Sequence, residues 1–332
     1  KSDTIPIMAL YQRLKRQILS KIILVRVFLT LLLLSGFLAF WFLVIKPLSR
    51  TSFSSLPSHS NRTNFAILGI SGGQHEGRDL TDTLIFVSID QSTGDTVLLT
   101  IPRDLWIPSL RAKINTAYHY GEKRQPGGGL ILAKSALSEV LDQPVDFALL
   151  IDFSGFIQAI DAIGGIDITI DRAFIDSKFP IPGKENDPCD TCRYETVNFS
   201  AGLQHLDGAT ALKFVRSRNA DGDEGTDFAR SQRQTKVIRA FEKKFLFYLP
   251  KLKQIFDQSI ITDIPPDTYF SLAKLGFKST RKNPRAFAIS EPLVYNPPVS
   301  AAQDYQWVLL PKDNNFSSLS NYVTGLLDSA RP

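Results

Sequence analysis

The sequence predicts an α/β fold whose layers surround a sheet that is buried on both faces. Nearly continuous apolar runs alternate along the chain with stretches of helical spacing. Apolar runs without polar alternation are typical of strands that other elements cover on both sides. The chain has 332 residues, of which 43% are hydrophobic and 21% charged, a composition that is ordinary for a folded protein with a sizeable core.

The apolar runs predict strands, and the periodic segments predict helices, in a regular order. Strands are expected at 65–70, 84–89, 97–101, 147–151 and 166–170. Helices are expected at 130–141, at 154–163 before Gly164-Gly165, and from Thr226 to about Tyr248. The short segment 209–216 is expected to end as a strand, and 179–192, rich in Pro, Gly and Asp, to be a loop insertion. Helices at 271–275 and 317–327 and a strand at 307–310 are expected to complete the same domain.

The positive charge of the chain is confined to its first residues. Residues 1–26 hold six basic side chains and one acidic one, so this tail accounts for the whole net charge of +5. The remaining 32 basic and 32 acidic side chains cancel. A chain whose basic residues gather in a tail in this way gives little support to nucleic-acid binding.

An uncharged apolar run at 27–45 (VFLTLLLLSGFLAFWFLVI) follows the basic tail. As a helix it would span about 29 Å, which matches the core of a bilayer. The flanking basic residues predict a cytoplasmic tail and a single pass through the cell membrane. A cleaved signal peptide is the alternative, against which the length of the run and the lack of a small-residue cleavage site argue. The Ser-rich segment 46–63 is expected to be a linker to an extracellular domain at 64–332.

Charged residues gather in three clusters near the ends of predicted strands, where α/β sheets place ligands. The first cluster is 78–83 (RDLTDT) and the second is 101–104 (IPRD). The third combines 215–218 (VRSR) with 227–234 (DFARSQRQ). Taken alone, Asp82 is better explained as a turn or cap residue, and Asp104 as the partner of a neighbouring cation.

The third cluster can bring several arginines to one point. In an extended strand, Arg216 and Arg218 point to the same face. One face of the following helix is expected to carry Asp227, Arg230, Gln234 and Val237, with Arg233 one step round. Because guanidinium groups bind phosphate oxygens in pairs, this spacing suggests an anion site. Surface salt bridges with neighbouring carboxylates are the alternative and the commoner use of such arginines.

Seven motifs in series, from about residue 64 to residue 238, resemble the LytR-CpsA-Psr family of cell-wall glycopolymer ligases. They are NFAILGI, LTDTLIFVSID, IPRD, KINTAYHYG, IDFSGFIQAIDAIGGIDI, GLQHLDGATALKFVRSR and DFARSQRQTKVI. The resemblance implies an α/β/α sandwich around a mixed sheet. It also implies phosphoryl transfer outside the membrane, in which a glycan arrives on a polyprenyl pyrophosphate carrier and a peptidoglycan hydroxyl attacks the sugar-side phosphorus. The products would be a glycan that is phosphodiester-linked to the wall, and polyprenyl phosphate.

The resemblance also assigns expected roles to site residues. Five arginines at matching positions would hold the phosphates: Arg103, Arg216, Arg218, Arg230 and Arg233. Gln234 would add a hydrogen bond, and Asp82 would hold a divalent cation, Mg²⁺ or Mn²⁺. Asp104 or Asp227 would orient an arginine or accept the proton of the attacking hydroxyl, and the sequence leaves both roles open.

The chain departs from the family pattern beside the expected metal position. Many members carry an acidic residue just after the first strand and an arginine two positions before the metal-binding aspartate. Here Ile70 follows Leu68-Gly69, and Leu80 stands where that arginine would be. A second metal ligand would therefore have to come from Glu76, Asp79 or His75, or metal binding would be weaker.

Two cysteines, Cys189 and Cys192, lie in the motif CDTC. In an oxidising outer compartment a small disulfide is the expected state, with a zinc half-site as the alternative. Two other functions stay open beside the ligase. The same site can use water as acceptor and act as a hydrolase, or the chain can be a membrane-anchored module that binds polyprenyl phosphate or wall polymer without catalysis.

Overall fold

The computed structural model describes residues 55–73, 77–184, 186–245, 248 and 258–329. Residues 55–332 form one compact unit, and β1 begins within the predicted linker, at Arg62. The expected cytoplasmic tail, the apolar run 27–45 and the linker up to residue 54 lie outside the described residues. Within the described ranges, the helices lack the combination of length and apolar character needed to span a bilayer.

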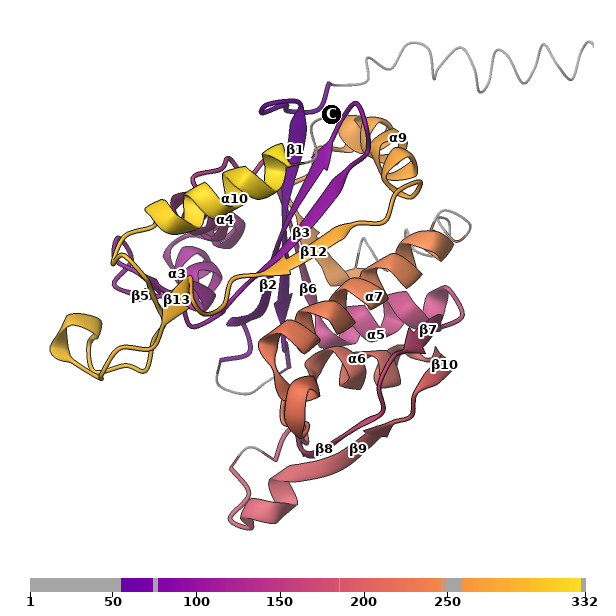
Figure 1. Cartoon of the computed structure of the whole chain (residues 1–332), viewed down its shortest axis with the longest axis vertical. Coiled ribbons are helices and arrows are strands. Elements are labelled where there is room, and N and C mark those ends of the chain that lie inside the picture. Colours follow the sequence, from indigo (N-terminus) through magenta and orange to yellow (C-terminus); the bar gives the residue numbers. More distant parts are fainter. Residues whose placement is uncertain (1–54, 74–76, 185, 246–247, 249–257, 330–332) are drawn as a thin grey trace, which may run out of the picture. The chain divides into compact units, whose positions relative to one another are not determined.

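A six-stranded mixed sheet forms the centre of the unit (Figure 1). Its order is β11-β6-β1-β2-β3-β12. The strands are β1 (Arg62–Ile70), β2 (Thr81–Asp90), β3 (Thr96–Ile101), β6 (Phe147–Asp152), β11 (Ile260–Thr262) and β12 (Arg285–Ala288). The pairs β1/β6 and β3/β12 are parallel and the other neighbours are antiparallel, so the predicted mixed sheet is confirmed.

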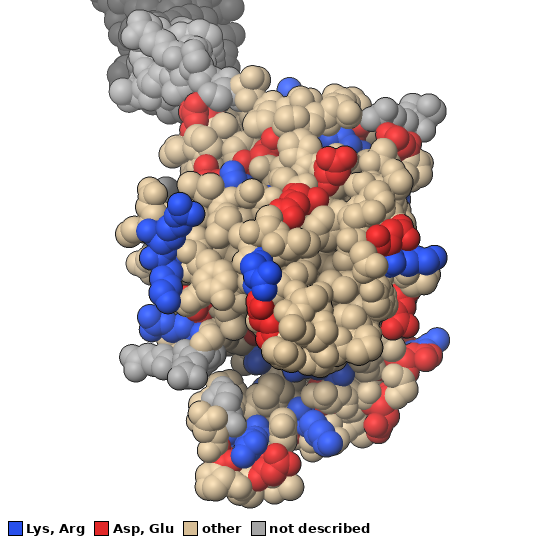
Figure 2. All heavy atoms as spheres, turned by 90° about the vertical axis from the view of Figure 1, so that its left-hand side faces the viewer, with Lys and Arg blue, Asp and Glu red and all other residues tan. Residues whose placement is uncertain are grey.

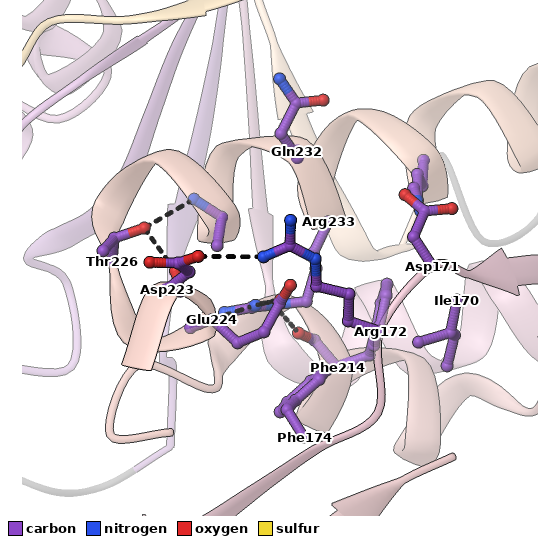
Figure 3. Close-up of a pocket in the computed structure, with 12 residues that line it drawn as sticks. Ile170, Asp171, Arg172, Phe174, Phe214, Asp223, Glu224, Thr226, Gln232 and Arg233 are labelled. Carbon is purple, nitrogen blue, oxygen red and sulfur yellow. Dashed lines mark hydrogen bonds and ion pairs between the residues drawn. The ribbon is translucent and has the colours of Figure 1, made fainter. Parts of the chain in front are cut away.

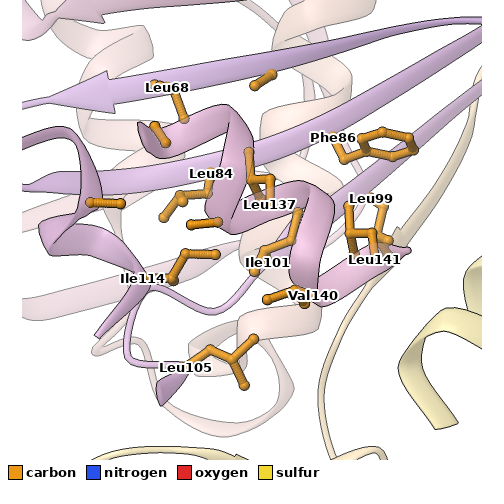
Figure 4. Packing of buried hydrophobic residues seen from close by; sticks show 14 of the residues in the cluster. Leu68, Leu84, Phe86, Leu99, Ile101, Leu105, Ile114, Leu137, Val140 and Leu141 are labelled. Carbon is orange, nitrogen blue, oxygen red and sulfur yellow. The ribbon is translucent and has the colours of Figure 1, made fainter. Parts of the chain in front are cut away.

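One face of the sheet packs against α3 (Ala117–Arg124), α4 (Gly128–Leu141) and α10 (Ser317–Asp328). Figure 4 shows Leu137, Val140 and Leu141 of α4 beside Leu84 and other strand residues. These side chains are almost completely buried, and burying one leucine stabilises the fold by about 1.5–3 kcal/mol. The strands are apolar throughout because this core covers one face of the sheet and other helices cover the second face.

The opposite face packs against two other helices, α7 (Asp227–Phe245) and α9 (Tyr269–Ser279). Side chains alternate along β2, so Ile85 and Val87 point to this second face, where Ile238 of α7 and Leu272 of α9 contact their cluster. Figure 1 shows α7 and α9 on the side of the sheet away from α4 and α10.

A second apolar core lies beside the sheet, below α7 in Figure 1. It is built by α5 (Phe153–Ala162), β7 (Ile166–Ile170), β8 (Phe174–Pro180), β9 (Tyr194–Phe199), β10 (Gly202–Leu206), α6 (Gly208–Arg216) and part of α7. Three aromatic rings, Phe174, Phe199 and Phe214, lie with centroids 5.0–6.1 Å apart at its centre.

The predicted strands at 65–70, 84–89, 97–101, 147–151 and 166–170 and the main helices are confirmed, two local predictions are wrong, and the bounds of a third are shifted. Residues 208–216 form helix α6, because Asp207 accepts a hydrogen bond from the Thr210 N–H and caps it while Ala211 and Phe214 face the core. The loop insertion is shorter than 179–192, since Phe179 is buried in the hairpin β8/β9. The strand expected at 307–310 is instead the short β14 (Leu310–Pro311).

The surface carries charges of both signs. Figure 2 shows one face of the molecule. On this face, Lys and Arg form one narrow row at an edge and are otherwise interspersed with Asp and Glu. The face in Figure 2 lacks the broad basic footprint that nucleic-acid-binding surfaces carry.

Candidate active site

Asp82 and Arg103 meet at one end of the sheet because β2 and β3 are antiparallel. Asp82 is the second residue of β2, and Arg103 follows the last residue of β3 by two positions. The register pairs Leu84 with Ile101, which brings the start of one strand beside the end of the other. We call this region, with its charged residues Asp82, Arg103, Asp104 and Lys113, the site end of the sheet.

The four charged side chains of the site end form a connected chain of ion pairs. The Arg103 Nη1 donates to Asp82 Oδ1 at 2.5 Å, and Arg103 Nε lies 3.4 Å from Asp104 Oδ2. Lys113 Nζ donates to the other oxygen of Asp104 at 2.8 Å. Side-chain exposure of 20–35% leaves these groups accessible to a ligand. Burial alone would lower the pKa of Arg103, but the Asp82 and Asp104 carboxylates raise it above its ordinary value, so the guanidinium stays charged.

The loop before β2 places a second carboxylate near the site end. Asp79 Oδ2 lies 2.7 Å from His119 Nδ1 of α3, so this carboxylate holds an imidazole. His119 thus has the hydrogen-bonding role that suits a partly exposed histidine. The other two candidates for a second metal ligand, His75 and Glu76, lie outside the described residues.

The two arginines of the VRSR motif do not share a strand face. Arg216 ends helix α6, and its guanidinium lies over the ring of Phe153 at 4.2 Å and near Phe179 at 5.3 Å. Arg218 is exposed in the following loop, and its side chain has no hydrogen-bond or ion-pair partner among the described residues. Its backbone N–H donates to Asp176, a fully buried carboxylate that orders this loop. Arg218 is therefore a solvent-facing cation on a fixed loop.

The α7 residues differ sharply in burial. Arg233 is only 3% exposed, and its guanidinium donates to the carbonyl oxygens of Phe214, Ser217 and Glu224 and to the Glu224 carboxylate. Burial lowers the pKa of Arg233, although the nearby Glu224 carboxylate opposes this. Arg233 thus ties the end of α6 to α7, and a role in phosphate binding stays a prediction.

The remaining predicted residues lie on the adjoining turns of α7. Arg230 is half-buried, and Gln234 and Val237 are buried. The Gln234 amide oxygen finds no hydrogen-bond partner in the described part of the chain. Asp227 begins the helix, and its side chain is outside the described residues.

Two contacts bring the arginine segments to the site end of the sheet. Ser231 of α7 hydrogen-bonds Thr100 near the end of β3, at 2.9 Å. Arg216 lies over Phe153, which directly follows β6, and β6 runs parallel to β1 and ends at the same side. These contacts place α7 and the end of α6 next to the strands whose ends form the site end.

Sequence reasoning did not single out three residues that shape this region: Lys113, Asn115 and Asp176. Lys113 neutralises Asp104, and the Asn115 N–H donates to the Arg103 carbonyl oxygen while its own buried amide oxygen stays unpaired within the described residues. The motif KINTAYHYG contains the first two, so its polar positions were the available signal. Asp176 carries no such signal, since the loop residues Arg218 and Asn219 that it binds are more than 40 residues away.

A cavity of about 500 Å³ opens beside α7, between β7 and η4 (Gly222–Gly225) (Figure 3). Arg233 lines it, but Asp82, Arg103 and Arg218 do not. Its charged groups pair with one another, as Arg172 does with Asp223 and Lys236 with Asp171. The cavity is therefore separate from the Asp82–Arg103 pair.

The donor atoms near Asp82 fit a cation that arrives with phosphate, and do not fit a complete protein cage. In the part of the chain that the structure describes, the only group of three close Asp, Glu, His or Cys ligands lies elsewhere, at Asp187, Cys189 and Cys192. Mg²⁺ typically takes one or two carboxylates and completes its shell with substrate phosphates and water. Asp82 offers such a carboxylate.

Cys189 and Cys192 form a disulfide in the loop of the hairpin β8/β9. This pairing uses both sulfur atoms, which leaves neither as a thiolate for a zinc half-site.

Comparison with known proteins agrees with the fold and the motifs. The model of the LytR_cpsA_psr family matches residues 46–291. The chain belongs to this family.

Curated relatives include transferases. A polyisoprenyl-teichoic acid--peptidoglycan teichoic acid transferase TagU of Oceanobacillus iheyensis is 31% identical over 58% of this chain and 57% of its own length. A protein of the same name from Bacillus cereus (strain AH820) is 25% identical over 68% of each chain. The chain spans little more than half the length of the first relatives it matches.

Solved structures share the fold. Protein gbs0355 from Streptococcus agalactiae (22% identical, TM-score 0.58) is covered over 90% of its length and covers 82% of this chain. TagV of Bacillus subtilis (23%, TM-score 0.55) covers 81% of this chain and is itself covered over 98%. TagT bound to LI-WTA (19%, TM-score 0.55) covers 83%, with 94% of its own chain matched. At these identities the likeness concerns the fold alone.

Proposed function

We propose that this protein is a phosphotransferase that moves a glycopolymer from a polyprenyl pyrophosphate carrier onto a hydroxyl of peptidoglycan. The observation that carries the proposal is the partly exposed Asp82–Arg103 pair at the site end, next to which two contacts hold the arginine-bearing helices α6 and α7. The transferase names of the curated relatives support the choice of reaction.

The proposed reaction asks the protein mainly to hold and neutralise a pyrophosphate. The acceptor oxygen attacks the sugar-side phosphorus, the bond from that phosphorus to the bridging oxygen breaks, and polyprenyl phosphate leaves. Negative charge spreads over the phosphate oxygens in the transition state, where fixed guanidinium groups stabilise it. Arg218 is exposed and Arg103 is half-buried, so both can turn part of their donors toward phosphate oxygens.

The proton of the acceptor hydroxyl needs a carboxylate. Asp104 accepts from two cations, Arg103 and Lys113, an arrangement that suits the orientation of an arginine. Asp227 begins α7 beside Arg230 and stays the other candidate.

Asp82 would hold Mg²⁺ or Mn²⁺ together with oxygens of the pyrophosphate. When bound, such a cation would neutralise part of the charge on the phosphates. Because Arg103 pairs with one oxygen of Asp82, a cation at this carboxylate would compete with Arg103 for its negative charge. We therefore expect metal affinity to be weak without pyrophosphate and to increase when a pyrophosphate ligand is present.

We also propose that the apolar run 27–45 anchors the protein in the cell membrane with the tail inside and the folded unit outside. This placement puts the folded unit on the same side of the membrane as a lipid-linked donor and the wall. Flotation of the full chain with vesicles, compared with a chain in which Leu33 and Leu34 are replaced by Arg, tests the anchor.

The test of the function uses the full chain in vesicles with a short-chain polyprenyl pyrophosphate glycan. Release of polyprenyl phosphate is followed with and without Mg²⁺, and then with peptidoglycan fragments as acceptor. Glycan transfer to the fragments supports the ligase. Release without transfer would mean a hydrolase, and tight binding without release would mean a binding module.

A further inference from the structure

Helix α9 presents an aromatic and basic face to solvent, at the end of the sheet opposite the site end. Tyr269, Phe270 and Phe277 are each more than half exposed. The opposite side of the helix packs inward through Leu272 and the buried Leu275. The aromatic residues are therefore an outward-facing set on a helix whose core-facing side is already satisfied.

Basic side chains accompany these rings. Lys274 on the helix and Arg281 and Lys282 just after it are exposed, and the Arg281 guanidinium lies 5.0 Å from the centroid of the Phe277 ring. The segment 268–282 contains no acidic residue. We define the α9 face as Tyr269, Phe270, Lys274, Phe277, Arg281 and Lys282.

The α9 face lies where the folded unit begins. Leu56, near the first described residue, packs against the same apolar cluster as Leu272. Gln91 links the two segments, since its side chain donates to the Pro57 carbonyl oxygen and its own carbonyl oxygen accepts from Lys278. Figure 1 shows α9 beside the end of the unit at which β1 starts.

From these observations we propose that the α9 face rests on the surface of a bilayer that contains anionic lipids. The inference rests on the proposed membrane anchor. Between the apolar run and Ser55 there are nine residues, 46–54, which reach at most about 30 Å when extended. The end of the unit that carries α9 is thus tethered close to the membrane.

The chemistry of the face matches that surface. Aromatic rings favour the interface between headgroups and acyl chains, and lysine and arginine are attracted to anionic headgroups. A second copy of the chain is a poorer occupant, because a symmetric contact would place like charges against each other.

The test uses the full chain in vesicles of phosphatidylcholine and phosphatidylglycerol, with lipids brominated on the acyl chains as quenchers. A tryptophan is introduced at the face (Phe277→Trp) or, as the matched control, at an exposed leucine on β10 (Leu203→Trp), which Figure 1 shows far from α9. The signal of the three native tryptophans is subtracted with the unchanged chain. We expect the brominated lipid to reduce the emission at position 277 about twofold, as for a side chain 5–10 Å into the interface, and to leave position 203 unchanged.

Charge reversal gives a second readout. In the Phe277→Trp background, Lys274→Glu combined with Lys282→Glu should remove most of the quenching. Replacing phosphatidylglycerol by phosphatidylcholine should also remove most of the quenching in the Phe277→Trp chain without charge reversal. Equal quenching at both positions, or none at 277 in a chain that floats with the vesicles, would overturn the proposal. A blue-shifted but unquenched tryptophan emission at position 277 would also overturn the proposal, since it would indicate contact with protein. A chain that does not float at all would remove the anchor and this proposal together, whereas release of polyprenyl phosphate tests the transferase separately.

Discussion

The two ends of strand β2 use charge in opposite ways. At its start, Asp82 pairs with Arg103, and both side chains are about one-third exposed. At its other end, Asp95 receives two hydrogen bonds from Arg285 and one from Arg62, a guanidinium that is only 3% exposed. The first pair can open to a ligand, whereas the Arg62–Asp95 pair is enclosed and holds strands together. Arginine–carboxylate pairs at the ends of one strand can therefore serve chemistry or structure, and exposure distinguishes them.

The largest effect is expected from Asp82→Asn. Loss of this carboxylate should reduce the release of polyprenyl phosphate by about a thousandfold, or about 4 kcal/mol in the transition state, since both the cation site and the partner of Arg103 are lost. The melting temperature of the Asp82→Asn variant should change little, because a half-exposed ion pair contributes about 0–1 kcal/mol. Turnover and thermal unfolding are measured on the same preparation. Unchanged turnover would remove Asp82 from the site.

At the other end of β2, we expect Asp95→Asn to reduce stability and to leave turnover nearly unchanged. The buried Arg62 would lose its charged partner, so the unfolding free energy should fall by about 2–4 kcal/mol. Denaturant unfolding measures this loss, and turnover per folded molecule, corrected for the folded fraction, should stay near that of the unchanged chain. A protein with normal stability but reduced turnover would contradict the division between the two ends.

The arginines around α6 and α7 sharpen the comparison. Arg218→Ala should lower turnover about 10- to 100-fold, the value of one charge-assisted hydrogen bond, without loss of stability because the side chain is exposed. Arg172→Ala is the matched control, since Arg172 is also exposed but pairs with Asp223 beside the separate cavity. Similar losses in both variants would indicate a general effect of surface charge.

Arg233→Ala tests whether burial also separates structural arginines from phosphate-binding arginines around α6 and α7. Its guanidinium holds three backbone carbonyl oxygens and Glu224, so removal should destabilise the fold by about 3 kcal/mol. Urea unfolding measures the change, with Arg218→Ala as the reference. A normal stability with lost turnover would instead make Arg233 a phosphate ligand.

The sequence predicted most of the sheet, because strands buried on both faces are apolar throughout and stand out from the helices between them. It misassigned the end of 209–216 as a strand, where the Asp207 cap and the inward-facing Ala211 and Phe214 favour a helix. That error placed Arg216 and Arg218 on one strand face, although one lies on a phenylalanine ring and the other in a loop.

The motifs located the charged clusters but not the partners of each charge. Arg103 and Arg233 look alike in the sequence, yet one pairs with half-exposed carboxylates and the other is enclosed by carbonyl oxygens. Partners such as Asp176 and Lys113 come from distant or adjoining segments, so spacing alone does not reveal them. Burial is a property of the assembled layers, and it separates structural arginines from accessible ones.

The smallest effect is expected at Asp90, the last residue of β2, whose carboxylate accepts from Ser92 and Thr93 rather than from an arginine. Burial alone would raise the pKa of Asp90, but these hydrogen bonds lower it to about 2. Because the folded pKa lies below the unfolded value of 3.8, the carboxylate stabilises the fold above that value and ceases to do so as the pH falls toward 2. Asp90→Asn should therefore lower the unfolding free energy by about 1 kcal/mol near neutral pH, with the difference shrinking in acid. Urea unfolding at a series of pH values measures it, and a difference that stays constant down to the lowest pH at which the protein folds would show that the turn depends on the shape of the side chain and not on its charge.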